Sequence, residues 1–140
     1  MTIVAPVAIA LMVGVVDFGM GFSARATLGK SARDAARYLA GLPQSAYCQS
    51  WAEASAKNLA VYGNTAGTGN PVISGWSVSG VSITPVPATS CPAAGSTIVV
   101  TASYSYSSII LAGAIPGYLP ALPSTFNWSA QHQEVQVGGS

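Results

Sequence analysis

The sequence predicts an α+β protein with a long N-terminal helix, apolar and then amphipathic, a short second helix and a small antiparallel β-sheet. Three observations lead to this fold class. Residues 3–22 are almost wholly apolar, residues 23–41 repeat apolar side chains at helical spacing, and three later segments alternate at a period of two. The 140 residues are 50% hydrophobic, 6% charged and formally +1, which excludes a disordered chain and a basic nucleic-acid-binding surface.

Residues 3–22 have the length and composition of a membrane-spanning helix. Every side chain except Asp17 is apolar, glycine or proline, and about 20 such residues match the ~30 Å hydrocarbon core of a bilayer. Pro6 lies in the first turn, where its missing N–H costs little. Gly14, Gly19 and Gly21 would let neighbouring helices approach closely. The sequence therefore predicts a helix that crosses a membrane and packs against other helices.

Asp17 is the one ionisable residue of this segment. A carboxylate near the middle of a bilayer costs about 2.5–3.5 kcal/mol, so a partner or a functional use is expected. Arg25 is about 12 Å away along the same helix, too far to pair with Asp17. We therefore expect a cation from a neighbouring subunit, either its Arg25 or its amino terminus. The alternative is a hydrated carboxylate at the level of the headgroups.

The same helix is predicted to continue to residue 41 and to become amphipathic. Gly41 and Pro43 supply the stop signal. A helix over residues 3–41 would be about 58 Å long, twice the thickness of a bilayer core, so its second half must pack on other parts of the protein. The apolar residues expected on that packed face are Ala24, Leu28, Ala32, Ala35, Ala36 and Leu39.

A shorter helix is predicted over residues 46–63, ending at Gly63. We expect one face of it to hold Trp51, Ala54, Asn58, Leu59 and Tyr62.

The two cysteines, Cys48 and Cys91, lack the spacing of a metal site. They predict a disulfide formed in an oxidising compartment. The chain is thus expected to divide into a transmembrane helix, residues 1–41, and an exported, disulfide-closed αβ domain, residues 42–140.

Three segments predict the antiparallel sheet: residues 72–87, 97–107 and 125–137. In the second, one face carries Ile98, Val100, Ala102, Tyr104 and Tyr106 while the other carries serine and threonine, as in a half-buried strand. In the first, a change of phase at Gly80 indicates a β-bulge. The connection 108–123 is long and apolar, so it either forms an exposed interface or folds under the sheet to complete the core.

The sequence contains no arrangement of residues that indicates catalysis. His132 is the only histidine, so neither a metal site nor a nucleophile–base pair is indicated. No phosphate-binding or dinucleotide-binding motif occurs. We expect no cofactor, no metal and no enzymatic activity.

The stretches IVAPVAIALMVGVVDFG and ARATLGKSARDAARYLAG resemble the TadE-like family of tight-adherence (Flp-type, type IV) pilus systems. The processing signal of that family, a basic leader ending in Gly and followed by Glu, does not appear among the 140 residues. NLAVYG at 58–63, VVTASYSY at 99–106 and the QEVQV that contains Glu134 also look like the family. The positions that carry the resemblance most clearly are Pro6, Asp17, Phe18, Gly19, Ala36 and Arg37.

The resemblance implies a pilin-like structural subunit that takes part in pilus or pseudopilus assembly and adhesion, without catalysis. It implies self or other pilin subunits, an inner-membrane assembly platform and membrane lipid as partners. The location would be the bacterial inner membrane before assembly, then the periplasm or a cell-surface pilus. The alternative is a membrane-anchored extracytoplasmic binding module with no filament role. The residues expected to serve assembly are Pro6, Gly14, Asp17, Gly19, Gly21 and Arg25.

Overall fold

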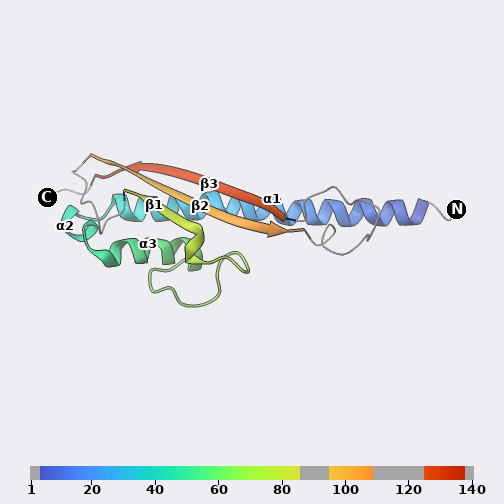
Figure 1. Cartoon of the computed structure of the whole chain (residues 1–140), viewed down its shortest axis with the longest axis horizontal. Coiled ribbons are helices and arrows are strands. Elements are labelled where there is room, and N and C mark those ends of the chain that lie inside the picture. The colour runs from blue at the N-terminus through green and yellow to red at the C-terminus, as the bar shows by residue number, and fades with distance from the viewer. Residues whose placement is uncertain (1–3, 86–94, 109–124, 138–140) are drawn as a thin grey trace.

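The computed structural model describes residues 4–85, 95–108 and 125–137. Helix α1 runs without interruption from Val4 to Ala40, 37 residues or about 55 Å. It ends where the sequence predicts, with the N–H of Gly41 bonded to the carbonyl of Arg37. Figure 1 shows that the strands lie along only part of α1 and that its N-terminal portion extends beyond them.

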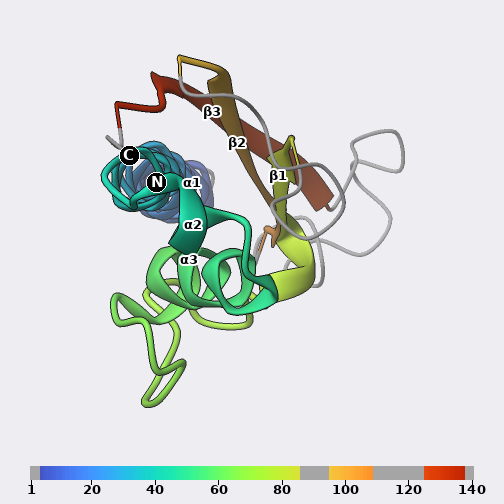
Figure 2. The ribbon, with the colours of Figure 1, turned by 90° about the vertical axis from the view of Figure 1, so that its left-hand side faces the viewer.

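The second half of α1 forms one side of the hydrophobic core, as predicted. Five of the six apolar residues expected on its packed face are fully buried, and Ala24 is half-buried. The core lies between α1, the helix α3 (Ser50–Tyr62) and the inner face of the sheet. Figure 2 shows how these elements are arranged in a view along α1. The five fully buried residues are Leu28, Ala32, Ala35, Ala36 and Leu39.

The predicted short helix is α3, Ser50–Tyr62, preceded by the single turn α2, Gln44–Tyr47. It ends at Gly63, whose left-handed backbone (φ 71°) lets its N–H bond the carbonyl of Leu59. The residues expected on one face of this helix are not the ones that are buried. Trp51 and Ala54 are exposed, whereas the buried residues are Ala52, Ala56, Ala60 and Val61. Small side chains on both α1 and α3 allow the two helices to pack closely, and this favours alanine over tryptophan at the contact.

We expect Ala56→Leu to lower the free energy of unfolding by about 1–3 kcal/mol, because the larger side chain overpacks a fully buried position. Ala54→Leu is the matched control, since the same substitution at an exposed position of α3 should change stability by less than about 0.5 kcal/mol. Urea unfolding of both variants measures the difference. Equal effects would contradict the orientation of α3.

The sheet has three antiparallel strands in the order β1-β2-β3: β1 Val81–Thr84, β2 Thr97–Ser107 and β3 Thr125–Val135. The α+β fold class is confirmed. On β2, Ile98, Val100 and Ala102 are buried and Tyr104 and Tyr106 are half-buried, which confirms the predicted inner face.

The first strand is much shorter than predicted. Of the predicted segment 72–87 the structure describes residues 72–85, and of these only 81–84 pair with β2. The predicted bulge at Gly80 is instead a 3₁₀ turn, Val78–Gly80. The indole N–H of Trp76 donates to the carbonyl of Ser103 at 2.8 Å and occupies the edge of β2 beyond β1. A Cβ on Gly80 would lie 2.5 Å from that same carbonyl oxygen, so this turn needs glycine.

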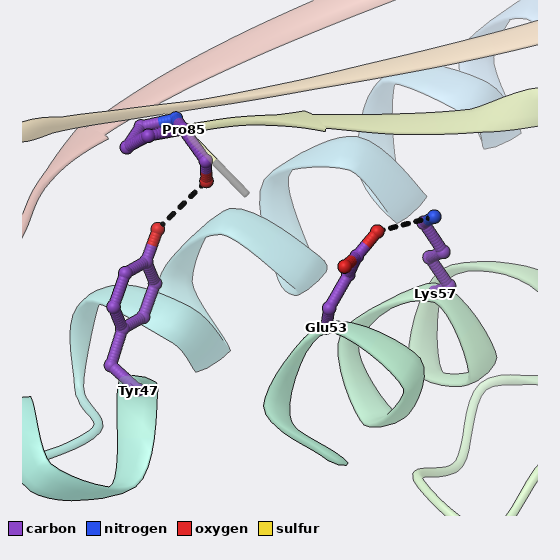
Figure 3. A network of polar contacts seen from close by, with 4 residues as sticks. All are labelled: Tyr47, Glu53, Lys57 and Pro85. Carbon is purple, nitrogen blue, oxygen red and sulfur yellow. Dashed lines mark hydrogen bonds and ion pairs between the residues drawn. The ribbon is translucent and has the colours of Figure 1, made fainter. Parts of the chain in front are cut away.

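Tyr47 joins α2 to the end of β1. Its ring is fully buried, and its hydroxyl donates to the carbonyl of Pro85 at 3.0 Å (Figure 3). Figure 3 also shows the ion pair that Lys57 and Glu53 form on α3. Burial raises the pKa of Tyr47, and the charge of Glu53 raises it further.

Cys48 follows Tyr47 and is not a free thiol. Cys91 lies outside the described residues, so the Cys48–Cys91 disulfide stays a prediction. The connection 108–123 also lies outside them, apart from Ser108.

Candidate functional site

The N-terminal half of α1 exposes a continuous apolar surface. Leu11, Met12, Val15 and Phe18 are each about 70% exposed (68%, 72%, 74% and 72%). Within the described residues, α1 includes a span over Leu11–Ala40 that is long and apolar enough to cross a membrane, by length and composition. Such a surface is unfavourable in water, so it indicates a membrane or a protein partner.

Asp17 breaks this apolar surface on the side of α1 that faces the sheet. Its side chain is only 7% exposed. The hydroxyl of Tyr106 donates to Oδ1 of Asp17 at 2.5 Å, and the hydroxyl of Ser108 donates to Oδ2. Tyr106 lies at the C-terminal end of β2, and Ser108 directly follows that strand. The carboxylate is thus bound by two hydroxyl groups of its own chain.

The sequence led us to expect a cation from a neighbouring subunit or a hydrated carboxylate, and neither expectation includes these two donors from the same chain. A contact of Asp17 with a neighbouring subunit stays a prediction. Arg25 is also engaged within the chain, since its guanidinium carbon lies 5.5 Å from the centroid of the Trp128 ring. Cation–π attraction of this kind is worth about 0.5–1 kcal/mol at an exposed site. A charge exchange between Asp17 and Arg25 is therefore not expected to restore function.

Gly21 permits the close approach of the sheet to α1. A Cβ built on Gly21 would lie 3.7 Å from the ring of Tyr106 and 3.8 Å from that of Trp128. A methyl group would just fit, but a longer side chain would push both rings away. Asp17, Gly21 and Arg25 follow one another at intervals of four, so they share one face of α1. We call this contact between α1 and Tyr106, Ser108 and Trp128 the Asp17 clasp.

The other residues predicted to serve assembly lie outside the clasp. Apart from the backbone of α1 itself, no atom of the described residues lies within 4 Å of a Cβ built on Gly14 or Gly19, so neither glycine is covered by the described part of the chain. Pro6 lies within α1, but its side chain is not among the described atoms. A hollow of about 310 Å³ opens beside the clasp, and its lining includes Gly14, Phe18 and Phe126.

Sequence reasoning missed the three partners of α1 in the clasp. The sequence did place Tyr106 on the inner face of β2, and the register now sets Tyr104 opposite Trp128 and Tyr106 opposite Phe126. The missing information was the length over which β2 follows α1. The sequence did hold a signal for this contact. An aspartate in an apolar helix requires hydrogen-bond donors, and two hydroxyl groups, those of Tyr106 and Ser108, lie at and just after the end of a half-buried strand.

The hydrogen bond to Asp17 raises the pKa of Tyr106 from its ordinary 10.0 to about 12, with smaller contributions from burial and from the Asp17 charge. The folded chain therefore holds this proton to a higher pH than the unfolded chain. The stability that results is complete below pH 10 and is lost as the pH rises to about 12.

We expect the tyrosinate absorbance of Tyr106, taken as the difference between wild type and Tyr106→Phe, to titrate near pH 12. In an Asp17→Asn background the same difference should titrate closer to pH 10, because the carboxylate is gone. A wild-type transition already at pH 10 would show that the hydrogen bond does not form.

The fold and the clasp define a class of protein: a long helix, apolar and exposed in its first half, on whose second half a small αβ domain is built. The sequence model of a family described as TadE-like protein matches residues 1–37. The resemblance is therefore confirmed over this segment: residues 1–37 are similar to the TadE-like family. No curated protein and no solved structure matches the chain. The similarities noted at 58–63, 99–106 and Glu134 lie outside the matched residues and stay predictions.

Proposed function

We propose that this chain is a structural, pilin-like subunit of a tight-adherence pilus, held in the inner membrane by α1 before assembly and then placed in a pilus or pseudopilus. The observation that carries the proposal is the exposed apolar half of α1 within a TadE-like segment. Open glycines at 14 and 19 suit close contact with the helices of other subunits. Adhesion and the assembly platform as a partner belong to the same proposal.

In this proposal residues 1–41 form the anchoring and assembly helix, and residues 42–140 form the exported domain. The second half of α1 serves both parts, because its buried face completes the core of the domain. No catalysis is proposed for the chain. Its described residues contain no group of three His, Cys, Asp or Glu side chains that could hold a metal ion.

Crosslinking through added cysteines tests the filament role. Val13 and Phe22 are suitable sites because they are 40% and 61% exposed, whereas Gly21 is covered by the sheet. A Val13→Cys/Phe22→Cys chain should give a ladder of oligomers on oxidation in cells that assemble the pilus. The wild-type chain, with Cys48 and Cys91 alone, is the control and should give no ladder. Dimers at most, under every assembly condition, would contradict the filament role.

The alternative, a membrane-anchored binding module, rests on a second hollow of about 360 Å³ at the edge of β2. Its lining carries no formal charge and includes Ser77, Ser105 and Asn127. Serine and asparagine side chains suit a neutral, hydrogen-bonding ligand. If the chain is a binding module, a variant that cannot form the crosslinked ladder should still bind its ligand normally.

A further inference from the structure

The clasp fixes the level at which the sheet ends on α1. Tyr106 contacts Asp17, and both Tyr106 and Trp128 lie against Gly21. Phe126 pairs with Tyr106 across the two strands and is 40% exposed. We call Tyr106, Phe126 and Trp128 the aromatic end of the sheet. It therefore lies level with residues 17–21 of α1.

The exposed side of α1 remains apolar beyond this level. Phe18, Met20 and Phe22 are 72%, 43% and 61% exposed, and the polar part of the helix begins only at Ser23. From Asp17 to Phe22 the helix rises about 7–8 Å. If the exposed apolar surface of α1 is in hydrocarbon as far as Phe22, the aromatic end of the sheet reaches about 7–8 Å below the boundary of the apolar region.

That depth and that composition are those of the membrane interface. Tryptophan and tyrosine are enriched there because each has an apolar ring and a polar group, and interfacial apolar faces enter the headgroup and acyl boundary by about 5–10 Å. Arg25 is on the next turn of α1 and over the ring of Trp128, so in this placement it would lie at the height of the headgroups. The hollow beside the clasp is walled by Phe18, Phe126 and Trp128 and would be filled by acyl chains.

We propose that the aromatic end of the sheet is inserted in the membrane interface, so that the exported domain lies against the bilayer rather than being held above it on a bare helix. The partner is the bilayer itself. This inference rests on the proposed membrane location of α1. The clasp then has a clear physical role, because the hydroxyls of Tyr106 and Ser108 solvate the Asp17 carboxylate where water is scarce.

Fluorine NMR of the full chain tests this placement, because Trp128 can be compared with the other two tryptophans, Trp51 and Trp76. Trp128 is at the aromatic end, Trp76 is buried in the core and Trp51 is exposed on α3. The chain would be labelled with 5-fluorotryptophan and reconstituted in phosphatidylethanolamine–phosphatidylglycerol vesicles. Trp→Phe variants assign the three signals. Lipids with a nitroxide on the upper acyl chain would then be added.

We expect the Trp128 signal to lose most of its intensity and the Trp51 signal to keep its intensity. Trp76 lines the same hollow as Trp128, so its signal should fall in between. A Leu11→Trp variant reports on α1, since Leu11 is exposed in its apolar half. Loss of that added signal with an unchanged Trp128 signal would overturn the inference and leave the proposed function intact. No loss of either signal would overturn the membrane location, and with it both proposals.

Discussion

Replacing both hydroxyl donors of the clasp, in the variant Tyr106→Phe/Ser108→Ala, should release the end of the sheet from α1. Asp17 is 7% exposed, so the carboxylate cannot exchange these donors for water without a local opening. A hydrogen bond to a charged group contributes about 1.5–3 kcal/mol, and the double variant removes two of them. The measurement is urea unfolding of the detergent-solubilised chain, together with hydrogen exchange of β2.

Tyr104→Phe is the matched control for this variant. The hydroxyl of Tyr104 lies on the same strand and donates to the neutral carbonyl of Ser74 at 3.0 Å. Its loss should cost only about 1 kcal/mol. If the double variant is no less stable than Tyr104→Phe, the clasp does not hold the sheet against α1.

Two arginines in the apolar half of α1 should have the second large effect, this time on membrane insertion. Leu11 and Val15 are four residues apart and are 68% and 74% exposed, so Leu11→Arg/Val15→Arg leaves the core unchanged. Each arginine costs about 2.5–3.5 kcal/mol near the middle of a membrane helix. We expect the variant to leave the membrane fraction in a flotation assay and to form no pilus.

The control places the same two arginines elsewhere on the helix. Ser23 and Ala26 are exposed and follow the apolar segment, so Ser23→Arg/Ala26→Arg should float with the membrane as the wild type does. Release of both variants would show only that added charge is harmful. Retention of Leu11→Arg/Val15→Arg in the membrane would contradict insertion of this half of α1.

The sequence was informative where a single element determines its own structure. The apolar run, the spacing of Leu28, Ala32 and Leu39, and the stop at Gly41 are local, so α1 and its packed face were predicted correctly. The alternation on β2 was equally clear. These patterns follow from helical and strand periodicity and need no knowledge of neighbouring elements.

The errors all concern contacts between elements. On α3, the expected face held Trp51 and Ala54, whereas the residues buried in the core include Ala52 and Ala56. Before β1, alternation pointed to a long strand, but the Trp76 indole took the place of a backbone donor at the edge of β2. The partner of Asp17 was sought among cations on other chains because the end of β2 could not be placed on α1 without the register of the whole sheet.

Asp17 joins the apolar helix to the sheet of its own chain, and we propose that assembly depends on that joint. Pilus yield relative to the membrane level of the subunit tests it, in wild type, Asp17→Asn, Tyr106→Phe/Ser108→Ala and the triple variant. We predict that both partial variants lose yield to a similar extent and that the triple variant is no worse than either, because all three break one contact. A loss of yield in Asp17→Asn with normal yield in Tyr106→Phe/Ser108→Ala would contradict the claim and assign the carboxylate to a partner outside the chain.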